Sequence, residues 1–143
     1  MRYMLLVKAT ARFEAGIAGG SEYAQAWAAF REALEDAGAL LAEEWLQPSA
    51  SGVRIAYPAP GGRPELTAGP FARETGPVAG YVLIEAGSAE EATAWALRMP
   101  EPDDSGEVAI EVRELAEREG LRSWRTEAAA AELRDHLGML RRL

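Results

Sequence analysis

The first eight residues, Met-Arg-Tyr-Met-Leu-Leu-Val-Lys, form a predicted strand that is apolar on both of its faces. Tyr3, Leu5 and Val7 point to one side, because successive side chains of a strand alternate between its faces. Met4 and Leu6 point to the other side. Such a strand is typical of the middle of a sheet that is covered on both faces. The chain must therefore place this sheet between two layers.

Two amphipathic helices are predicted. The first spans residues 21–37, where apolar side chains recur at spacings of four, three and four, and Gly38 ends it. These side chains are Tyr23, Trp27, Phe30 and Leu34. The second helix starts with Ser88 and Glu91, which form a capping box, and continues to Arg98 before Pro100.

The order of the predicted strands defines a fold class. After the first strand, the pattern predicts strands over residues 39–46, 52–57, 65–67, 78–85 and 107–113. The second and third of these flank a Pro- and Gly-rich turn and form a hairpin, whereas residues 68–77 are expected to form an irregular loop. With residues 39–46 and 52–57 counted as one strand that Pro48 interrupts, the order β-α-β-β-β-α-β predicts a ferredoxin-like α+β fold, with helices on one face of an antiparallel sheet. A second subunit is the expected cover of the other face, as in a dimeric α/β barrel.

The last part of the chain is predicted to be a helical extension of this domain. We place the domain at residues 1–116 and the extension at residues 117–143, which contain an apolar stripe about four turns long. The extension carries six Arg and five acidic residues, whereas the whole chain has a net charge of −8. Such a segment is expected to pack on its own domain or on the partner subunit.

Composition excludes several classes of function. Acidic residues outnumber Lys and Arg by 23 to 15, which argues against binding to nucleic acid. No apolar run is long enough to cross a membrane, and the first residues do not form a signal peptide, so a cytoplasmic location is expected. The chain has no cysteine, which excludes disulfides and thiolate chemistry.

Several ordered segments resemble the YCII-related, or DGPF-domain, family. They are Met1-Arg-Tyr-Met-Leu-Leu, Leu46-Gln-Pro48, Thr67-Ala-Gly-Pro-Phe71, Gly80-Tyr-Val-Leu-Ile84, residues 89–100 and Ile110-Glu-Val-Arg113. The resemblance covers roughly residues 1–115. It implies a ferredoxin-like fold, usually a homodimer, with a cleft between sheet and helices or between subunits. Most members are small bacterial proteins, and some relatives are small-molecule lyases.

The chain departs from the family at positions that matter for chemistry. The family's Asp-Gly-Pro-Phe motif begins here with Ala68, and the His that many members carry on the first helix corresponds to Trp27. A His–Asp pair would act as a general acid and base, so the resemblance implies that this chain cannot use that device. The family's acidic residue after Pro-Phe-Ala is also replaced, by Arg73.

The remaining candidates are an aromatic group and a rigid loop. Trp27, Trp45, Tyr57 and Tyr81 are expected around the cleft, where they could hold a flat organic ligand oriented by Arg54 or by the loop's Arg73. The alternative is that these aromatic residues only pack the core. The loop over residues 69–77 carries Arg73 and Glu74, the candidate catalytic residues, although it could equally be a turn whose Phe71 fills the core.

Neither a cofactor nor a metal is expected. His136 is the only histidine and has no convincing partner, which favours a solvent-exposed side chain. The acidic pairs Glu43-Glu44 and Asp103-Asp104 lack ligand spacing, and no phosphate-binding glycine motif is present.

Two functions from different classes fit these features. The first is a pocket protein for a cyclic or aromatic organic molecule, with a cofactor-free lyase or isomerase as the expected type of enzyme. The alternative is a non-catalytic interaction or regulatory module that has lost the His–Asp pair. A cavity that holds a charged residue among aromatic side chains would favour the first, and a filled core the second.

Overall fold

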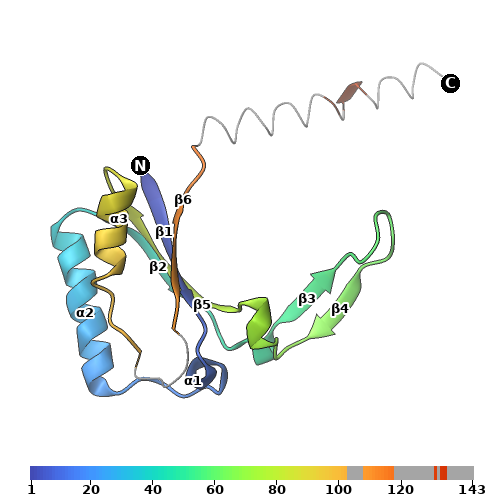
Figure 1. Ribbon diagram of the computed structural model, residues 1–143, viewed down its shortest axis with the longest axis horizontal. Coiled ribbons are helices and arrows are strands. Elements are labelled where there is room, and N and C mark those ends of the chain that lie inside the picture. Colours follow the sequence, from blue (N-terminus) through green and yellow to red (C-terminus); the bar gives the residue numbers. More distant parts are fainter. Residues whose placement is uncertain (103–107, 118–130, 132, 135–143) are drawn as a thin grey trace.

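The computed structural model describes residues 1–102, 108–117, 131, 133 and 134 (Figure 1). Its strands are β1 (Arg2–Lys8), β2 (Leu40–Trp45), β3 (Val53–Ala56), β4 (Glu65–Ala68), β5 (Val78–Glu85) and β6 (Ile110–Glu114). Its α-helices are α1 (Ala11–Glu14), α2 (Ser21–Asp36) and α3 (Ala89–Ala96), and two short 3₁₀ helices, η1 and η2, span Ser49–Ser51 and Arg73–Thr75.

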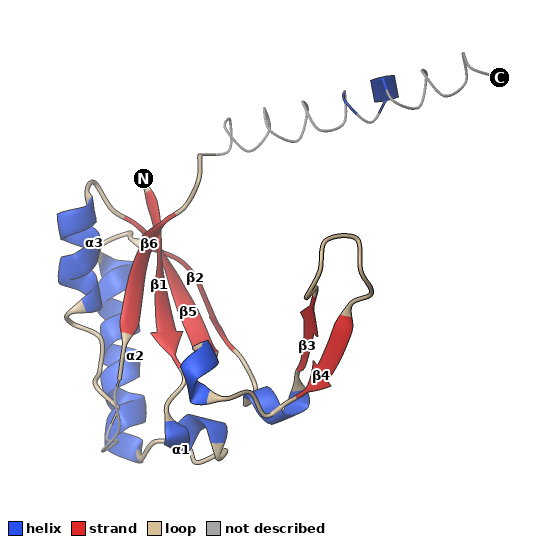
Figure 2. Ribbon diagram, turned by 45° about the vertical axis from the view of Figure 1, so that its right-hand side comes forward, coloured by secondary structure: helices blue, strands red, loops and turns tan. Residues whose placement is uncertain are grey.

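Four strands form an antiparallel sheet in the order β2-β5-β1-β6. Two of the helices, α2 and α3, lie together on one face of this sheet (Figure 2). This order and the β-α-β-β-α-β connection are those of a ferredoxin-like fold, with β3 and β4 as an added hairpin between β2 and β5. The predicted α+β class and the central place of the first strand are therefore confirmed.

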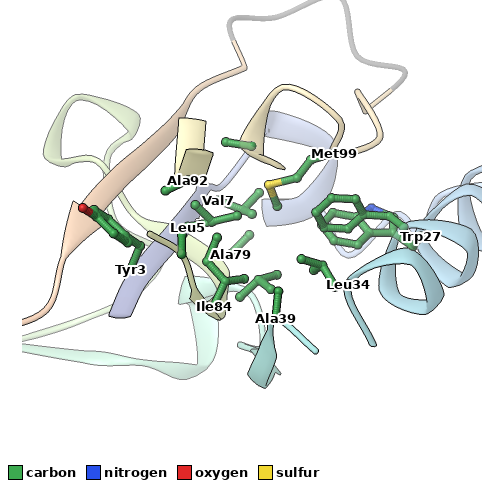
Figure 3. Close-up of a cluster of buried hydrophobic side chains, with 14 of the residues drawn as sticks. Tyr3, Leu5, Val7, Trp27, Leu34, Ala39, Ala79, Ile84, Ala92 and Met99 are labelled. Carbon is green, nitrogen blue, oxygen red and sulfur yellow. The ribbon is translucent and has the colours of Figure 1, made fainter. Parts of the chain in front are cut away.

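The core lies between the sheet and the two helices (Figure 3). Tyr3, Leu5 and Val7 of β1 are buried there, as the alternation in the sequence predicts. From α2, the side chains of Trp27, Phe30 and Leu34 complete the core, and Leu34 is 0% exposed. On the opposite face of β1, Met4 and Leu6 are only half-buried within one chain.

The predicted caps and turns define where the long helices begin and end. Gly38, just beyond α2, has a φ of +68°, a backbone conformation that favours glycine. At the start of α3, the Ser88 hydroxyl accepts a hydrogen bond from the Glu91 N–H at 3.1 Å. The Glu91 carboxylate in turn accepts one from the Gly87 N–H at 2.8 Å.

The hairpin of β3 and β4, called here the arm (residues 53–68), stands away from the sheet on the side opposite α2 and α3 (Figures 1 and 2). Ile55 pairs with Leu66 across the hairpin, and Val53 pairs with Ala68, so one face of the arm is apolar. Ile55 and Leu66 are 55% and 66% exposed. The arm thus presents an apolar face that nothing in the described part of the chain covers.

A polar network holds the root of the arm against α1. The Glu14 carboxylate accepts hydrogen bonds from the backbone N–H and the hydroxyl of Ser49, and the Ser49 hydroxyl accepts one from the Phe71 N–H at 2.9 Å. Gly69 lies so close that an added Cβ would be 1.7 Å from the Ser49 carbonyl oxygen. The Gly-Pro-Phe segment therefore serves as the base of the arm.

The structure corrects the predicted loops and leaves the extension largely outside the described residues. The sequence pattern missed α1, and the supposedly irregular segment 68–77 contains part of β4 and the short helix η2. Of the predicted extension beyond residue 117, including His136, only Ala131, Leu133 and Arg134 are described, and Leu133 is exposed. Within the described residues, no helix combines the length and apolarity that a membrane span requires.

Candidate functional site

A cavity of about 610 Å³ lies beside α2, where the first turns of that helix meet α1 and the ends of β1, β2 and β5. Its size falls in the range of ligand sites for small organic molecules, about 300–1,000 Å³. Residues from these elements line it, among them Phe13, Tyr23, Trp27, Arg31, Glu43 and Trp45.

Trp27 is the centre of the cavity's aromatic wall. Its ring meets those of Trp45 and Tyr23 edge to face, with centroid distances of 5.0 and 6.3 Å. Such edge-to-face pairs stabilise one arrangement of the rings. Gly80 makes room for this wall, because a Cβ there would lie 2.6 Å from Cε3 of Trp45.

The two tryptophans differ in their hydrogen bonding. The indole N–H of Trp45 donates to the Glu43 carboxylate at 2.8 Å. By contrast, the indole nitrogen of Trp27 is buried and has no hydrogen-bond partner among the described residues. Since Trp27 is only 7% exposed, water in bulk does not satisfy this donor. Trp27 therefore lines the cavity with a ring whose polar atom is buried and unpaired in the described structure.

Glu43 and Arg31 form the polar part of the wall. The Arg31 guanidinium donates to both carboxylate oxygens of Glu43, through Nε at 2.5 Å and Nη2 at 2.7 Å. These hydrogen bonds lower the pKa of Glu43 against the opposing effect of burial, and the Trp45 N–H adds to the lowering. The same pair raises the pKa of Arg31. Glu43 is therefore a fully engaged carboxylate that fixes Trp45 and Arg31 in place.

Two further cations, Lys8 and Arg12, line the cavity. The Lys8 ammonium lies 2.8 Å from the Glu111 carboxylate and lowers the pKa of that carboxyl. Within the described ranges, no group of three or more His, Cys, Asp or Glu side chains could hold a metal ion.

Only some of the residues singled out in the sequence meet at this cavity. Trp27 and Trp45 line it. Trp27 is also buried in the core, so it both packs the core and forms part of the cavity wall. Tyr57 and Arg54 do not, because they belong to the arm and its turn, where Tyr57 is exposed. Tyr81 alternates with the buried Val82 on β5 and so faces away from α2.

The proposed catalytic pair is also placed elsewhere. Arg73 and Glu74 are exposed on η2 and do not line the cavity. Near them, the Arg54 guanidinium lies over the Phe71 ring at 4.3 Å and donates to the Thr75 hydroxyl at 2.8 Å. Arg54 was expected to orient a ligand, but it lies outside the cavity and instead contacts Phe71 and Thr75 at the root of the arm. Ala68, at the position of the family's Asp, lies on β4 and is exposed.

Sequence reasoning missed Arg12, Arg31 and Glu43 as site residues. Arg31 follows Trp27 by four positions, so it continues the inner face of α2 with a charged side chain. Glu43 sits in a strand of otherwise unfavourable composition, on the face turned toward the helix. The sequence signal for this ion pair was a pair of opposite charges on faces otherwise expected to be apolar, Arg31 on α2 and Glu43 on β2.

Comparisons with known proteins identify the family to which the chain belongs. A search of curated proteins finds no match to the chain. The model of the YCII-related domain matches residues 1–117, which is most of the sequence. Together with the observed fold, this match shows that the chain belongs to the YCII-related family.

Proposed function

We propose that this protein binds a small, flat organic molecule in the cavity beside α2. The observation that carries the proposal is the buried indole N–H of Trp27, which lacks a partner in the described structure. A buried donor without an acceptor costs about 1–3 kcal/mol, and a ligand oxygen at this position would recover that free energy. Aromatic rings on the wall supply the contact area for a planar molecule.

The charged groups of the wall suit binding more than proton transfer. Glu43 accepts from Arg31 and Trp45, and its lowered pKa makes it a weak base at neutral pH. Arg73 and Glu74 take no part in this ligand site, because they lie on η2 outside the cavity. The proposal therefore covers ligand binding and assigns no lyase or isomerase step to a residue.

The cavity supports a ligand-binding protein over a pure interaction module. An ion pair, Arg31 with Glu43, lies among aromatic side chains there, which is the arrangement that favours a ligand site.

We further propose that a second copy of the chain covers the other face of the sheet. Four apolar side chains support this, because they lie on the face away from the helices and are half-buried; they are Met4, Leu6, Tyr81 and Leu83. The arm extends on the same side with its apolar face exposed. Apolar patches of this kind mark interfaces between proteins.

The solution mass tests the dimer. Light scattering after gel filtration is expected to give twice the chain mass for the wild type and a single chain mass for Leu83→Glu. Leu97→Glu is the matched control, because Leu97 is 82% exposed at the end of α3 and should leave the mass unchanged. A wild-type protein that stays monomeric at all concentrations would exclude the proposal.

A thermal-shift screen tests ligand binding. The compounds are planar one- and two-ring molecules, both neutral and charged, including aromatic and polycyclic acids. A ligand of the folded state must raise the melting temperature of the wild type. The rise should shrink in Trp27→Phe and persist in Trp95→Phe, because Trp95 lies on α3 outside the cavity. A screen without any stabilising compound, or with equal shifts in both variants, would contradict the proposal.

A further inference from the structure

We propose that the apolar face of the arm packs against a second copy of this chain, so that each copy holds the other with its arm. This inference rests on the proposed dimer and adds the surface that completes it. Three features carry it: the chemistry of the arm's two faces, the direction in which the apolar face points, and the small apolar surface that the sheet alone offers.

The two faces of the arm differ in chemistry. On β3, Val53 and Ile55 alternate with Arg54, and across the hairpin they pair with Ala68 and Leu66. Successive side chains of a strand point to opposite faces, so these four apolar side chains share one face and Arg54 lies on the other. Val53 is 59% exposed, close to the exposed fractions of Ile55 and Leu66. The whole apolar face is therefore unburied within one chain.

The described part of the chain does not cover this face. On the opposite face, the Arg54 guanidinium lies over the Phe71 ring and donates to the Thr75 hydroxyl of η2. The polar face of the arm is therefore turned toward η2, and the apolar face is turned away from it. Figures 1 and 2 also show the arm standing clear of the four-stranded sheet.

The root of the arm fixes this position. The Ser49 hydroxyl donates to the Glu14 carboxylate and accepts from the Phe71 N–H, which ties α1, η1 and the end of the arm together. A two-stranded hairpin is only marginally stable in water by itself and needs a further layer to pack against. A fixed root below an uncovered apolar face indicates an arm that another molecule completes.

A second copy accounts for both uncovered surfaces of the chain. A stable interface takes about 20–30 residues from each partner. Among the described residues, the free face of the sheet offers four large apolar side chains, which are Met4, Leu6, Tyr81 and Leu83. A dimer formed by the sheets alone would therefore be small and would leave both arms bare. The arm projects on the same side of the sheet, so a copy that packs on the free face lies next to it (Figure 2). In a two-fold dimer each contact occurs twice, so one arrangement covers both arms.

Charge favours this occupant over other macromolecules. The net charge of −8 opposes binding to nucleic acid and to anionic lipid surfaces. The four side chains on the apolar face of the arm carry no charge, so they can pack on a second acidic chain without bringing carboxylates together.

One substitution made at two places tests the arm in the whole chain. Ile55→Thr removes apolar surface from the arm, and threonine keeps the β-branched shape that suits a strand. Ile17→Thr is the matched control, because Ile17 has a similar exposed fraction, 50% against 55%, but lies between α1 and α2. By analytical ultracentrifugation, Ile55→Thr is expected to raise the dissociation constant of the dimer at least about tenfold, and Ile17→Thr to leave it unchanged. Equal dissociation constants for the two variants would overturn the inference.

A cross-link locates the contact without relying on a destabilising change. Photoreactive benzoylphenylalanine is placed at position 66 of the arm and, for comparison, at position 97, the exposed end of α3. Copies with ordinary and with heavy nitrogen are mixed before irradiation, so mass spectrometry separates links between copies from links within one. Position 66 is expected to link the two kinds of copy and position 97 is not. Links from position 66 that stay within one chain would contradict the inference.

The outcomes separate this inference from the proposed dimer. If Leu83→Glu is monomeric while Ile55→Thr dimerises like the wild type and position 66 gives no link between copies, the dimer stands and the role of the arm is wrong. If the wild type is monomeric at all concentrations, both fail. Binding of such a monomer to phosphatidylcholine vesicles would assign the apolar face of the arm to a lipid surface instead.

Discussion

Replacing Trp27 with phenylalanine should leave the ligand-free protein almost as stable as the wild type. Phenylalanine removes two buried ring carbons, which at about 0.8 kcal/mol for each buried carbon group costs about 1.5 kcal/mol. It also removes the buried N–H that has no described partner, which returns about 1–3 kcal/mol. The two effects oppose each other, so the expected change in unfolding free energy lies between a loss of about 0.5 kcal/mol and a gain of about 1.5 kcal/mol.

The same substitution should reduce ligand binding. A ligand at ten times its dissociation constant stabilises the wild type by about 1.4 kcal/mol. Loss of one hydrogen bond weakens binding about tenfold, so the stabilisation of Trp27→Phe at that concentration falls to about 0.4 kcal/mol. A ligand found in the screen should therefore raise the melting temperature of the wild type more than that of Trp27→Phe, although the two proteins have similar stability without ligand.

Urea unfolding followed by circular dichroism measures the first effect, and the melting temperature with ligand measures the second. Leu34→Ala is the reference for an ordinary core truncation, because Leu34 is fully buried and its loss should cost about 2–5 kcal/mol. A loss of about 3 kcal/mol or more in Trp27→Phe would refute the reasoning. It would mean that the indole N–H has an acceptor in the ligand-free protein.

Two further predictions concern the ion pair and the arm. Because Arg31 lowers the pKa of Glu43, the pair stabilises the fold above about pH 4.5, the ordinary value for this carboxyl, and the stabilisation is lost as the pH falls through the lowered pKa. Glu43→Gln should thus cost about 1–2 kcal/mol at pH 7 and progressively less as the pH falls below about 4.5. Glu44→Gln, a control on the opposite face, should be neutral, and a cost independent of pH would argue against the charge pair. Gly69→Ala should destabilise the protein by about 2–4 kcal/mol and speed proteolysis within residues 53–68, since its Cβ would clash with the Ser49 carbonyl. Gly20→Ala meets open space and should cost only about 0.5–1 kcal/mol, because glycine is preferred over alanine at the N-cap of a helix; equal effects in the two glycine variants would rule out the clash.

The predicted elements agree with the structure wherever the signal is local. The spacing of Trp27, Phe30 and Leu34 identifies the buried face of α2, and alternation identifies both faces of β1. Ser88 and Glu91 cap α3 as their separation predicts. Helical and strand periods and caps depend on residues a few positions apart, so one sequence contains the information needed.

The site depends on contacts that no local pattern contains. Arg31 and Glu43 are on different elements, and their pairing follows from how α2 packs on β2. Glu14 and Ser49, 35 positions apart, hold the root of the arm at α1, and the arm carries Arg54 away from the cavity. Tyr57 lies just beyond the last residue of β3, outside the cavity, and is exposed.

The amino-acid order by itself therefore determined the strands and the two long helices, their ferredoxin-like succession and the aromatic stripe of α2. Only the tertiary structure decided which side chains surround the cavity and that the Trp27 N–H has no acceptor in the described part of the chain. The physical reason is that hydrogen-bond satisfaction and enclosed volume are properties of packed segments, and these segments meet across distances along the chain that periodicity does not reach.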